Sequence, residues 1–136
     1  MVNRSQLTVL AFFAAAWIAF CCILLFAPHL YVGVLRVPPA IEGAAKIALL
    51  AVVTALIAAL VAMVLRRWRW GFWAIVLAFL AGALRAPASV LELTGKLPAS
   101  GPSWYVVVQG FVGVIQLAIG IALLVGYRKS GVWGAF

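Results

Sequence analysis

A few polar side chains interrupt the apolar stretches of this chain, and these are the residues that could do chemistry. Arg85 lies inside an apolar stretch, two residues before Pro87 and about eight residues from the end of that stretch, which is roughly 12 Å along a helix. Gln109 enters the next stretch from the same side at a similar depth. Glu92 and Gln116 come seven residues after Arg85 and Gln109, on the same helix faces. Because polar groups within a membrane span are costly, this set forms a functional hypothesis.

His29 and Glu42 lie near two other ends of apolar stretches on the same side. In one interpretation they join the first set in a polar pocket that opens outward and binds the head of a lipid or quinone, lined by His29, Glu42, Arg85, Glu92 and Gln109, with Gln116 beside it. We favour a structural interpretation. In it Arg85 extends to the interface or pairs with Glu92 or Glu42, while the glutamines bond between helices, because these groups can satisfy one another without a ligand.

The absent residue types argue against several functions. With one histidine the chain cannot supply two histidine ligands to a haem, and it has no Cys-x-x-Cys motif for thiol exchange. It has no Ser/His/Asp set, no paired carboxylates within an apolar stretch and no zinc motif. The first stretch lacks the acid that a four-helix multidrug antiporter would carry. We therefore expect no catalytic residue, no metal and no cofactor, and we expect His29 to be an interfacial side chain.

Composition and hydropathy predict the elements that must position these residues. Of 136 residues, 68% are hydrophobic and 9% are charged, and the mean hydropathy is +1.26, far from the values of soluble domains. A span needs about 20 apolar residues, so the sequence predicts four transmembrane helices, at 7–30, 39–65, 71–93 and 104–127. Short connectors predict an all-α integral membrane four-helix antiparallel bundle, a single domain over 1–136. The richness in Ala, Leu, Val, Gly and Arg favours the cytoplasmic (inner) membrane of a bacterium.

Charge predicts the orientation. The net charge of +8 is concentrated in short gaps between apolar stretches, which indicates a topology signal and no nucleic-acid partner. Most basic residues fall on one side, so the positive-inside rule places both termini in the cytoplasm. The tail 130–136 is too short to fold and is expected on the membrane surface. The residues expected to anchor the protein there are Arg66, Arg67, Trp68, Arg69, Trp70, Arg128, Lys129 and Trp133.

The two halves of the chain match at an offset of 60 residues. This offset aligns Arg36–Pro38 with Lys96–Pro98 and Arg69–Trp73 with Lys129–Trp133. Each half would be a helical hairpin in the same orientation, which is a parallel repeat. In so apolar a composition only the loop matches carry weight, so duplication and coincidence both stay open.

Several short features resemble those of a known group. Phe26-Ala27-Pro28 closes the first stretch, Glu42 heads the second, an arginine comes late in the third, and Gly95-x-x-Pro98 precedes a fourth stretch that contains a polar residue. In these features most of the chain resembles the small four-helix bacterial membrane proteins grouped as domains of unknown function. The resemblance implies a four-helix membrane fold and no activity. Where that group leads us to expect a glutamate in the fourth helix, this chain has a glutamine.

We predict a small non-catalytic accessory or scaffold subunit, which stabilises or regulates a larger membrane complex, or else a homo-oligomer. The missing catalytic groups and the short loops motivate this prediction, and the lipid bilayer is the other expected partner. One alternative is a binder or carrier of a lipid or quinone around Arg85. Another is a lipid-modifying enzyme that uses Glu42 or Glu92 with His29, ranked last because neither acid has an evident partner to tune it.

Overall fold

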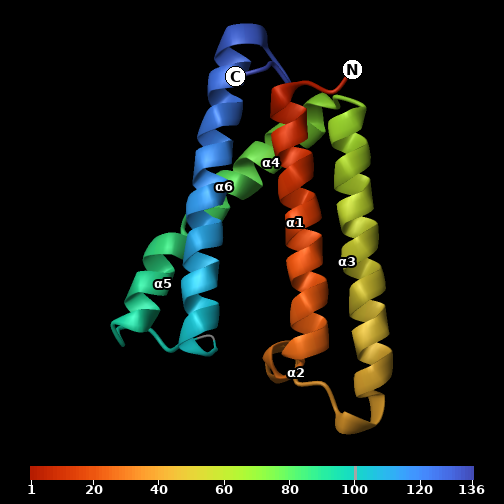
Figure 1. The fold of residues 1–136 in the computed structure, drawn as a ribbon, viewed down its shortest axis with the longest axis vertical. Helices are drawn as coiled ribbons and strands as arrows, with labels where there is room; N and C mark the ends of the chain where they lie inside the picture. Colours follow the sequence, from red (N-terminus) through yellow and green to blue (C-terminus); the bar gives the residue numbers. More distant parts are fainter. Residues whose placement is uncertain (100) are drawn as a thin grey trace.

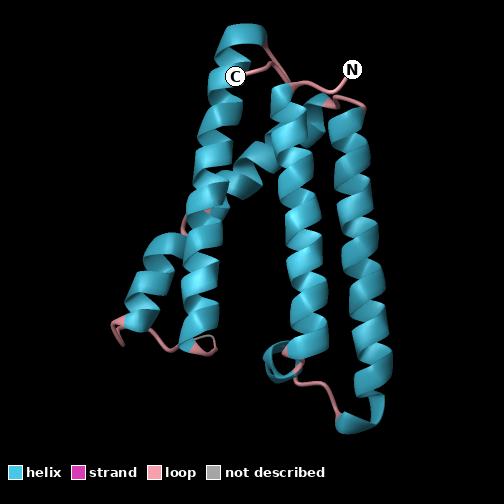
Figure 2. Ribbon diagram, viewed as in Figure 1, coloured by secondary structure: helices cyan, strands magenta, loops and turns pink. Residues whose placement is uncertain are grey.

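The described residues of this computed structural model, 1–99 and 101–136, form helices and no strand (Figure 2). The prediction of an all-α protein is therefore confirmed for them. Four of their apolar helical stretches are long enough to cross a membrane, which is the feature of a multi-pass membrane protein. In chain order the helices are α1 (Arg4–Phe26), α2 (His29–Leu35), the short 3₁₀ helix η1 (Pro39–Ile41), α3 (Glu42–Leu65), α4 (Arg69–Gly82), α5 (Arg85–Leu93) and α6 (Ser103–Ser130).

The helices form two arms. The first arm contains α1 to α3, and the second contains α4 to α6. Figure 1 shows the arms converging at the end that holds both termini, which we name the closed end, and diverging toward the opposite, open end. The tilted α4 connects the top of α3 to the second arm and crosses behind α1. The sequence predicted a four-helix antiparallel bundle, and the arms of the structure diverge over part of their length.

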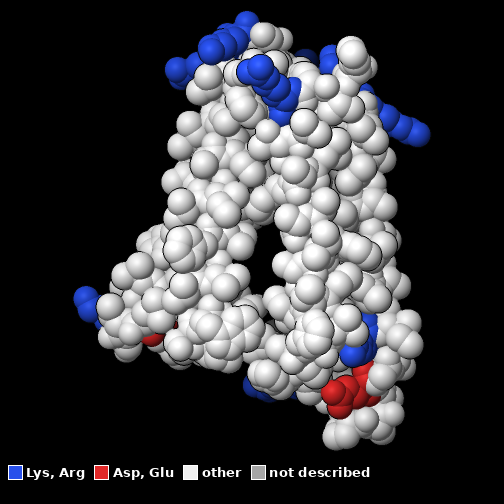
Figure 3. Space-filling model, viewed as in Figure 1, with Lys and Arg blue, Asp and Glu red and all other residues white. Residues whose placement is uncertain are grey.

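The hydrophobic core lies toward the closed end. There α4 packs its buried face between α1 and α6. Phe79 of α4 meets Phe12 and Phe13 of α1 edge to face, with ring centroids 4.9 and 6.1 Å apart. Figure 3 shows many of the lysine and arginine side chains around this end. The core residues are Val9, Phe13, Val64, Phe72, Ile75, Val76, Phe79, Ile119, Leu123 and Trp133.

The C-terminal tail joins this core, which corrects the expectation that it lies on the membrane surface. Trp133 is 1% exposed and packs its ring against Phe72 at a centroid distance of 5.2 Å. Its Nε1 donates to the Trp68 carbonyl at 3.2 Å, and the Ser5 hydroxyl donates to the Gly134 carbonyl at 2.6 Å. The tail is too short to fold alone but long enough to fill the space between the converging arms.

The third predicted span is two helices. Pro87 has no N–H to donate to the Ala83 carbonyl, which accepts instead from Ala86 N at 3.2 Å. The chain therefore turns between α4 and α5, and the 25-residue apolar stretch Arg69–Leu93 is bent. Pro28 acts similarly in the first arm, where α1 ends at Phe26 and the separate α2 begins at His29.

At the open end the arms touch again. A Cβ at Gly101 would lie 3.3 Å from Leu30 Cδ2, so α2 of the first arm lies against the chain just before α6. Figure 3 shows an opening between the arms, surrounded by uncharged side chains. The two arms are thus in contact at both ends of this opening. The larger contact, which contains the hydrophobic core, is at the closed end.

Candidate functional site

The main polar cluster lies between α5 and α6. Arg85 Nη2 donates a hydrogen bond to Gln109 Oε1, and Arg85 Nη1 lies 3.6 Å from Glu92 Oε1. The Glu92 side chain is 6% exposed and that of Arg85 is 36% exposed. The cation in this apolar arm is therefore balanced by an acid two helical turns away and by an amide of the neighbouring helix, as the structural interpretation predicted.

Glycines of α6 allow this helix to approach the bend between α4 and α5. A Cβ at Gly113 would lie 2.9 Å from Ala86 N and 3.1 Å from the Gly82 carbonyl oxygen. The Gln116 side-chain amide lies over Gly82, where a Cβ would collide with it. Small residues at a helix interface permit such close backbone approach. Gln109, Gly113 and Gln116 therefore share the face of α6 that meets the bend.

The predicted six-residue set divides between the arms. Arg85, Glu92 and Gln109 meet, and Gln116 lies farther along the same interface. His29 is exposed on α2, and Glu42 begins α3, both in the first arm. Figure 3 shows acidic side chains in two separate places, one over each arm. The structure therefore places the set in two groups, with Arg85, Glu92, Gln109 and Gln116 at the α5–α6 interface and its bend, and with His29 and Glu42 on α2 and α3.

The predicted anchors take different positions at the closed end. Trp68 and Trp70 are 58% and 79% exposed, and the arginines of this group are exposed as well. Arg67 also has a positive φ of 51°, which terminates α3. Its guanidinium donates to the Met1 carbonyl at 3.1 Å and to Gln6 Oε1 at 3.3 Å. Arg67 thus connects the end of α3 to the start of α1, and Trp133 is buried in the core.

Sequence reasoning missed the polar pair that organises this connection. Asn3 Oδ1 accepts from Gln6 N at 3.0 Å, while Asn3 N donates to Gln6 Oε1 at 3.2 Å, a reciprocal capping box at the start of α1. Gln6, 1% exposed, also donates from Nε2 to the Val64 carbonyl at 2.7 Å. The spacing of Asn3 and Gln6 is the sequence signal that could have found it.

Sequence reasoning also missed Ser89. This residue of α5 is 3% exposed and faces α6, where a Cβ at Gly110 would lie 3.2 Å from Ser89 Cβ. Its position four residues after Arg85 places it on the polar face of α5, and this spacing is the signal that was available.

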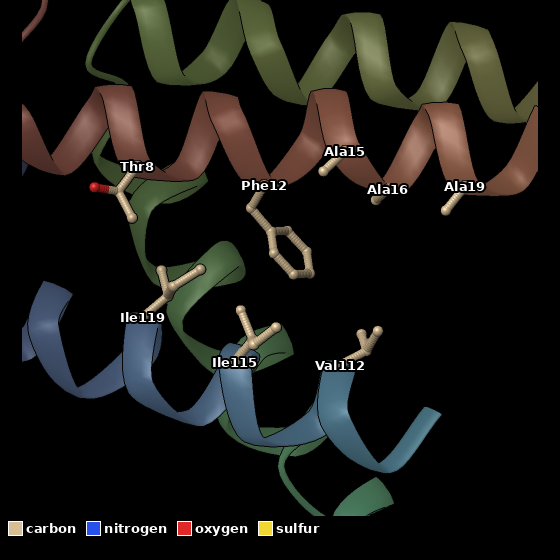
Figure 4. A pocket seen from close by; sticks show the side chains of 8 residues that line it. All are labelled: Thr8, Phe12, Ala15, Ala16, Ala19, Val112, Ile115 and Ile119. Atoms are coloured by element: carbon tan, nitrogen blue, oxygen red, sulfur yellow. The ribbon is translucent and has the colours of Figure 1, made fainter. Parts of the chain in front are cut away.

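A concave region lies between the two arms. Figure 4 shows the Phe12 ring pointing from α1 into a groove whose opposite wall is formed by Val112, Ile115 and Ile119 of α6. Its volume is about 380 Å³, and small alanines of α1 complete its lining. Thr8 is its polar side chain, and the Thr8 hydroxyl already donates to the Arg4 carbonyl at 2.9 Å. This groove therefore offers hydrophobic contact to an occupant.

Comparisons with known proteins give no family for this chain: no family model matches it, and no curated protein or solved structure matches it at a significant level.

Proposed function

We propose that this protein is a non-catalytic accessory subunit that docks on a larger membrane complex through α3. The observation that carries the proposal is the outer face of α3. Of the residues of this 24-residue helix, Val64 alone is buried, and all of them are described. A helix that belongs to a compact assembly normally buries one face, so the unburied surface of α3 suits a partner.

The side chains of α3 are sorted by size. Ile57, Leu60 and Val64 belong to the core or pack against it, on the side of α1. Alanines recur at alternating spacings of four and three residues on the opposite face, and all of them are exposed. These are Ala44, Ala48, Ala51, Ala55, Ala58 and Ala62.

The separation of large and small side chains on α3 favours a helix of another protein as the partner. Lipid tails are as apolar as leucine, so contact with lipid alone gives no reason to place small residues on the outer face. A continuous row of alanines instead lets another helix approach closely and gain van der Waals contacts along its length. We therefore assign the alanine row of α3 as the docking face.

The polar cluster supports the same function over the rival ligand carrier. Arg85 is engaged by Glu92 and Gln109, so its charge is balanced within the protein. In this proposal the cluster holds α5 against α6 and leaves the second arm as a rigid support. We further propose that the closed end faces the cytoplasm of a bacterium, because its excess of arginine follows the positive-inside rule.

The docking face can be tested by photocrosslinking in the native membrane. A photoreactive amino acid is placed singly at each position from 47 to 58 of α3, and at Ala118 of α6 as an exposed alanine control. We expect adducts with another protein at 48, 51, 55 and 58, and lipid adducts at the exposed intervening positions and at 118. Position 57 packs toward α1, so a probe there should give adducts within the chain. Adducts without this helical period, or lipid adducts alone at every α3 position, would contradict the proposal. Adducts that contain only this chain would replace the larger complex by a homo-oligomer.

A further inference from the structure

Two arginine side chains at the closed end have no acidic side chain of the protein as a partner. The two carboxylate side chains of the chain, Glu42 and Glu92, lie toward the open end (Figure 3), where Glu92 pairs with Arg85. Arg69, in the first turn of α4, and Arg128, in the last turn of α6, are both exposed. Among the described residues neither of them forms an ion pair with a side chain. These two cations are therefore available to an anion from outside the chain.

Arg128 lies at one end of an apolar groove between α4 and α6, which we name the Trp73 groove. Its volume is about 370 Å³, within the range of roughly 300–1,000 Å³ that is usual for ligand pockets. Ile121 precedes Arg128 by seven residues, so the groove follows α6 for about 10 Å from the arginine toward the open end. The groove is lined by Trp73, Ile121, Leu124, Val125, Tyr127 and Arg128.

Aromatic rings indicate the depth of the Trp73 groove in a membrane. Trp73 and Tyr127 meet edge to face, with ring centroids 5.0 Å apart, at the arginine end of the groove. Trp73 also lines a neighbouring hollow with Arg69 and Trp70, so the second arginine lies beside the same ring. Trp and Tyr are enriched where the headgroups of a bilayer meet its hydrocarbon. The arginines are thus at the depth of lipid phosphates, and the apolar walls continue into the depth of acyl chains.

This order of charge and apolar surface selects an anionic lipid among the candidate occupants. A guanidinium matches the geometry and charge of a phosphate, and a quinone head has no such charge. Free phosphate would leave the apolar walls unused. A zwitterionic phospholipid has a phosphate too, but its own cation offsets that charge, whereas uncompensated arginines favour a lipid with net negative charge.

We propose that the Trp73 groove binds one anionic glycerophospholipid, with the phosphate on Arg128 and the first part of an acyl chain along Ile121 and Val125. Arg69 adds a second positive charge on the other side of Trp73. The site is in the second arm and does not involve the alanine row of α3, so either proposal can fail without the other. It also leaves the Arg85 cluster in its structural role.

Lipids that differ in headgroup charge test the proposal. The purified full-length protein is mixed with equal amounts of phosphatidylglycerol and phosphatidylcholine of identical acyl chains, and the retained lipid is identified by native mass spectrometry. The ionic strength is about 0.1 M, at which charges more than about 10 Å apart are largely screened. We expect the first retained lipid to be phosphatidylglycerol by a ratio of about fivefold, the effect of one basic residue on an anionic lipid.

Two arginine variants separate a site from general charge attraction. Arg128→Gln should lose most of the preference for phosphatidylglycerol. Arg66→Gln makes the same change of net charge at an exposed residue that ends α3 and lines neither hollow beside Trp73, so it should keep the preference. Equal retention of both lipids by the unmodified protein would overturn the proposal without any variant. Equal losses in the two arginine variants would overturn it as well, because they would mean that net charge alone attracts the lipid.

The apolar part of the site is tested by filling it. Val125→Trp adds bulk within the groove, and Leu117→Trp adds the same bulk on α6 outside it, at residues that are 41% and 39% exposed. Val125→Trp should remove the preferentially retained phosphatidylglycerol, and Leu117→Trp should leave it bound. Retention that Val125→Trp does not change would mean that Arg128 binds a headgroup without its acyl chain, which contradicts the assigned site.

Discussion

The two arms are built from apolar chain of similar length but are held together in different ways. In the first arm α1 and α3 run unbroken, and bulky aliphatic side chains of α3 pack toward α1. In the second arm a bend separates α4 from α5, and glycines bring α6 against that bend. Packing in the first arm therefore relies on large side chains between the helices. Packing in the second arm relies on glycines, which let the helix backbones approach closely, and the polar cluster lies beside the bend.

The difference extends to the residues beyond the last helix of each arm. After α3 the chain continues through Trp68 into α4, whereas after α6 it turns at Gly131, with φ of 80°, and packs Trp133 into the core. Trp73, the counterpart of Trp133 at the 60-residue offset, is 38% exposed. The matched sequence pattern thus ends in two different structures, which makes the pair a direct comparison.

The largest effect is expected from Trp133→Ala. This variant removes a buried indole and its hydrogen bond to Trp68, so we expect the free energy of unfolding to fall by about 3–5 kcal/mol. Trp73→Ala, the matched control, should cost about 1 kcal/mol through its lost aromatic contacts. The free energy of unfolding of both variants is measured by reversible unfolding in mixed micelles. The transition is followed by the circular dichroism of the helices, because tryptophan fluorescence would itself change with the substitutions. Equal losses would mean that the tail contributes no more than a surface aromatic.

The next effect tests the glycine packing of the second arm. Gly113→Leu would force new atoms against the backbone at Ala86, and we expect a loss of about 2–3 kcal/mol from overpacking. Gly43→Leu in the first arm is the control, because a Cβ there meets nothing within 4 Å. The same unfolding measurement applies. If Gly113→Leu were as mild as Gly43→Leu, close approach of α6 would not stabilise the arm.

A smaller effect is expected from the ion pair. Glu92→Gln leaves Arg85 charged without its acid, and because Arg85 is partly exposed we expect a loss of about 1–2 kcal/mol. Removing both charges with Arg85→Gln and Glu92→Gln should recover most of it, since the cost arises from an uncompensated charge. Glu42→Gln should change the unfolding free energy by less than about 0.5 kcal/mol. A double variant that is less stable than Glu92→Gln would contradict this explanation.

The smallest effect concerns the hydrogen bond within the first arm. Trp17 Nε1 donates to Thr54 Oγ1 at 3.0 Å on the exposed side of the helix pair. Thr54→Val removes the acceptor at nearly constant volume and should cost about 0.6 kcal/mol, the usual value for such bonds between membrane helices. Thr54→Ser should retain the bond and most of the stability. A loss above that of Glu92→Gln would show that polar contacts matter as much in the first arm as in the second.

Part of the site could be predicted from residue spacing. Arg85 and Glu92 lie two helical turns apart on one face, and Gln109 enters the neighbouring helix at the same depth, so their meeting is a consequence of helix geometry. His29 and Glu42 could not be placed in the same way. Whether two helix ends on the same side of a membrane touch depends on how far the helices diverge, and hydropathy carries no information about that angle.

Local chemistry was informative even where it was overlooked. Asn3 and Gln6 have capping-box spacing, and Pro87 predicts an interruption wherever it falls within an apolar stretch. The prediction of one helix over 71–93 relied on hydropathy and did not account for Pro87. The bend matters because Arg85 is the first residue of α5, so the polar cluster begins at the bend.

The sequence by itself determined that the chain is helical, and where its apolar stretches begin and end, because the backbone of a membrane-spanning segment must satisfy its hydrogen bonds internally and so has few choices. It also determined which polar groups could pair along one helix. The tertiary structure alone decided which faces meet: the tail fills the closed end, the arms diverge, and the alanine row of α3 stays uncovered. The long helices α1, α3, α4 and α6 are similarly apolar on every face, so mainly side-chain size and close packing distinguish their faces.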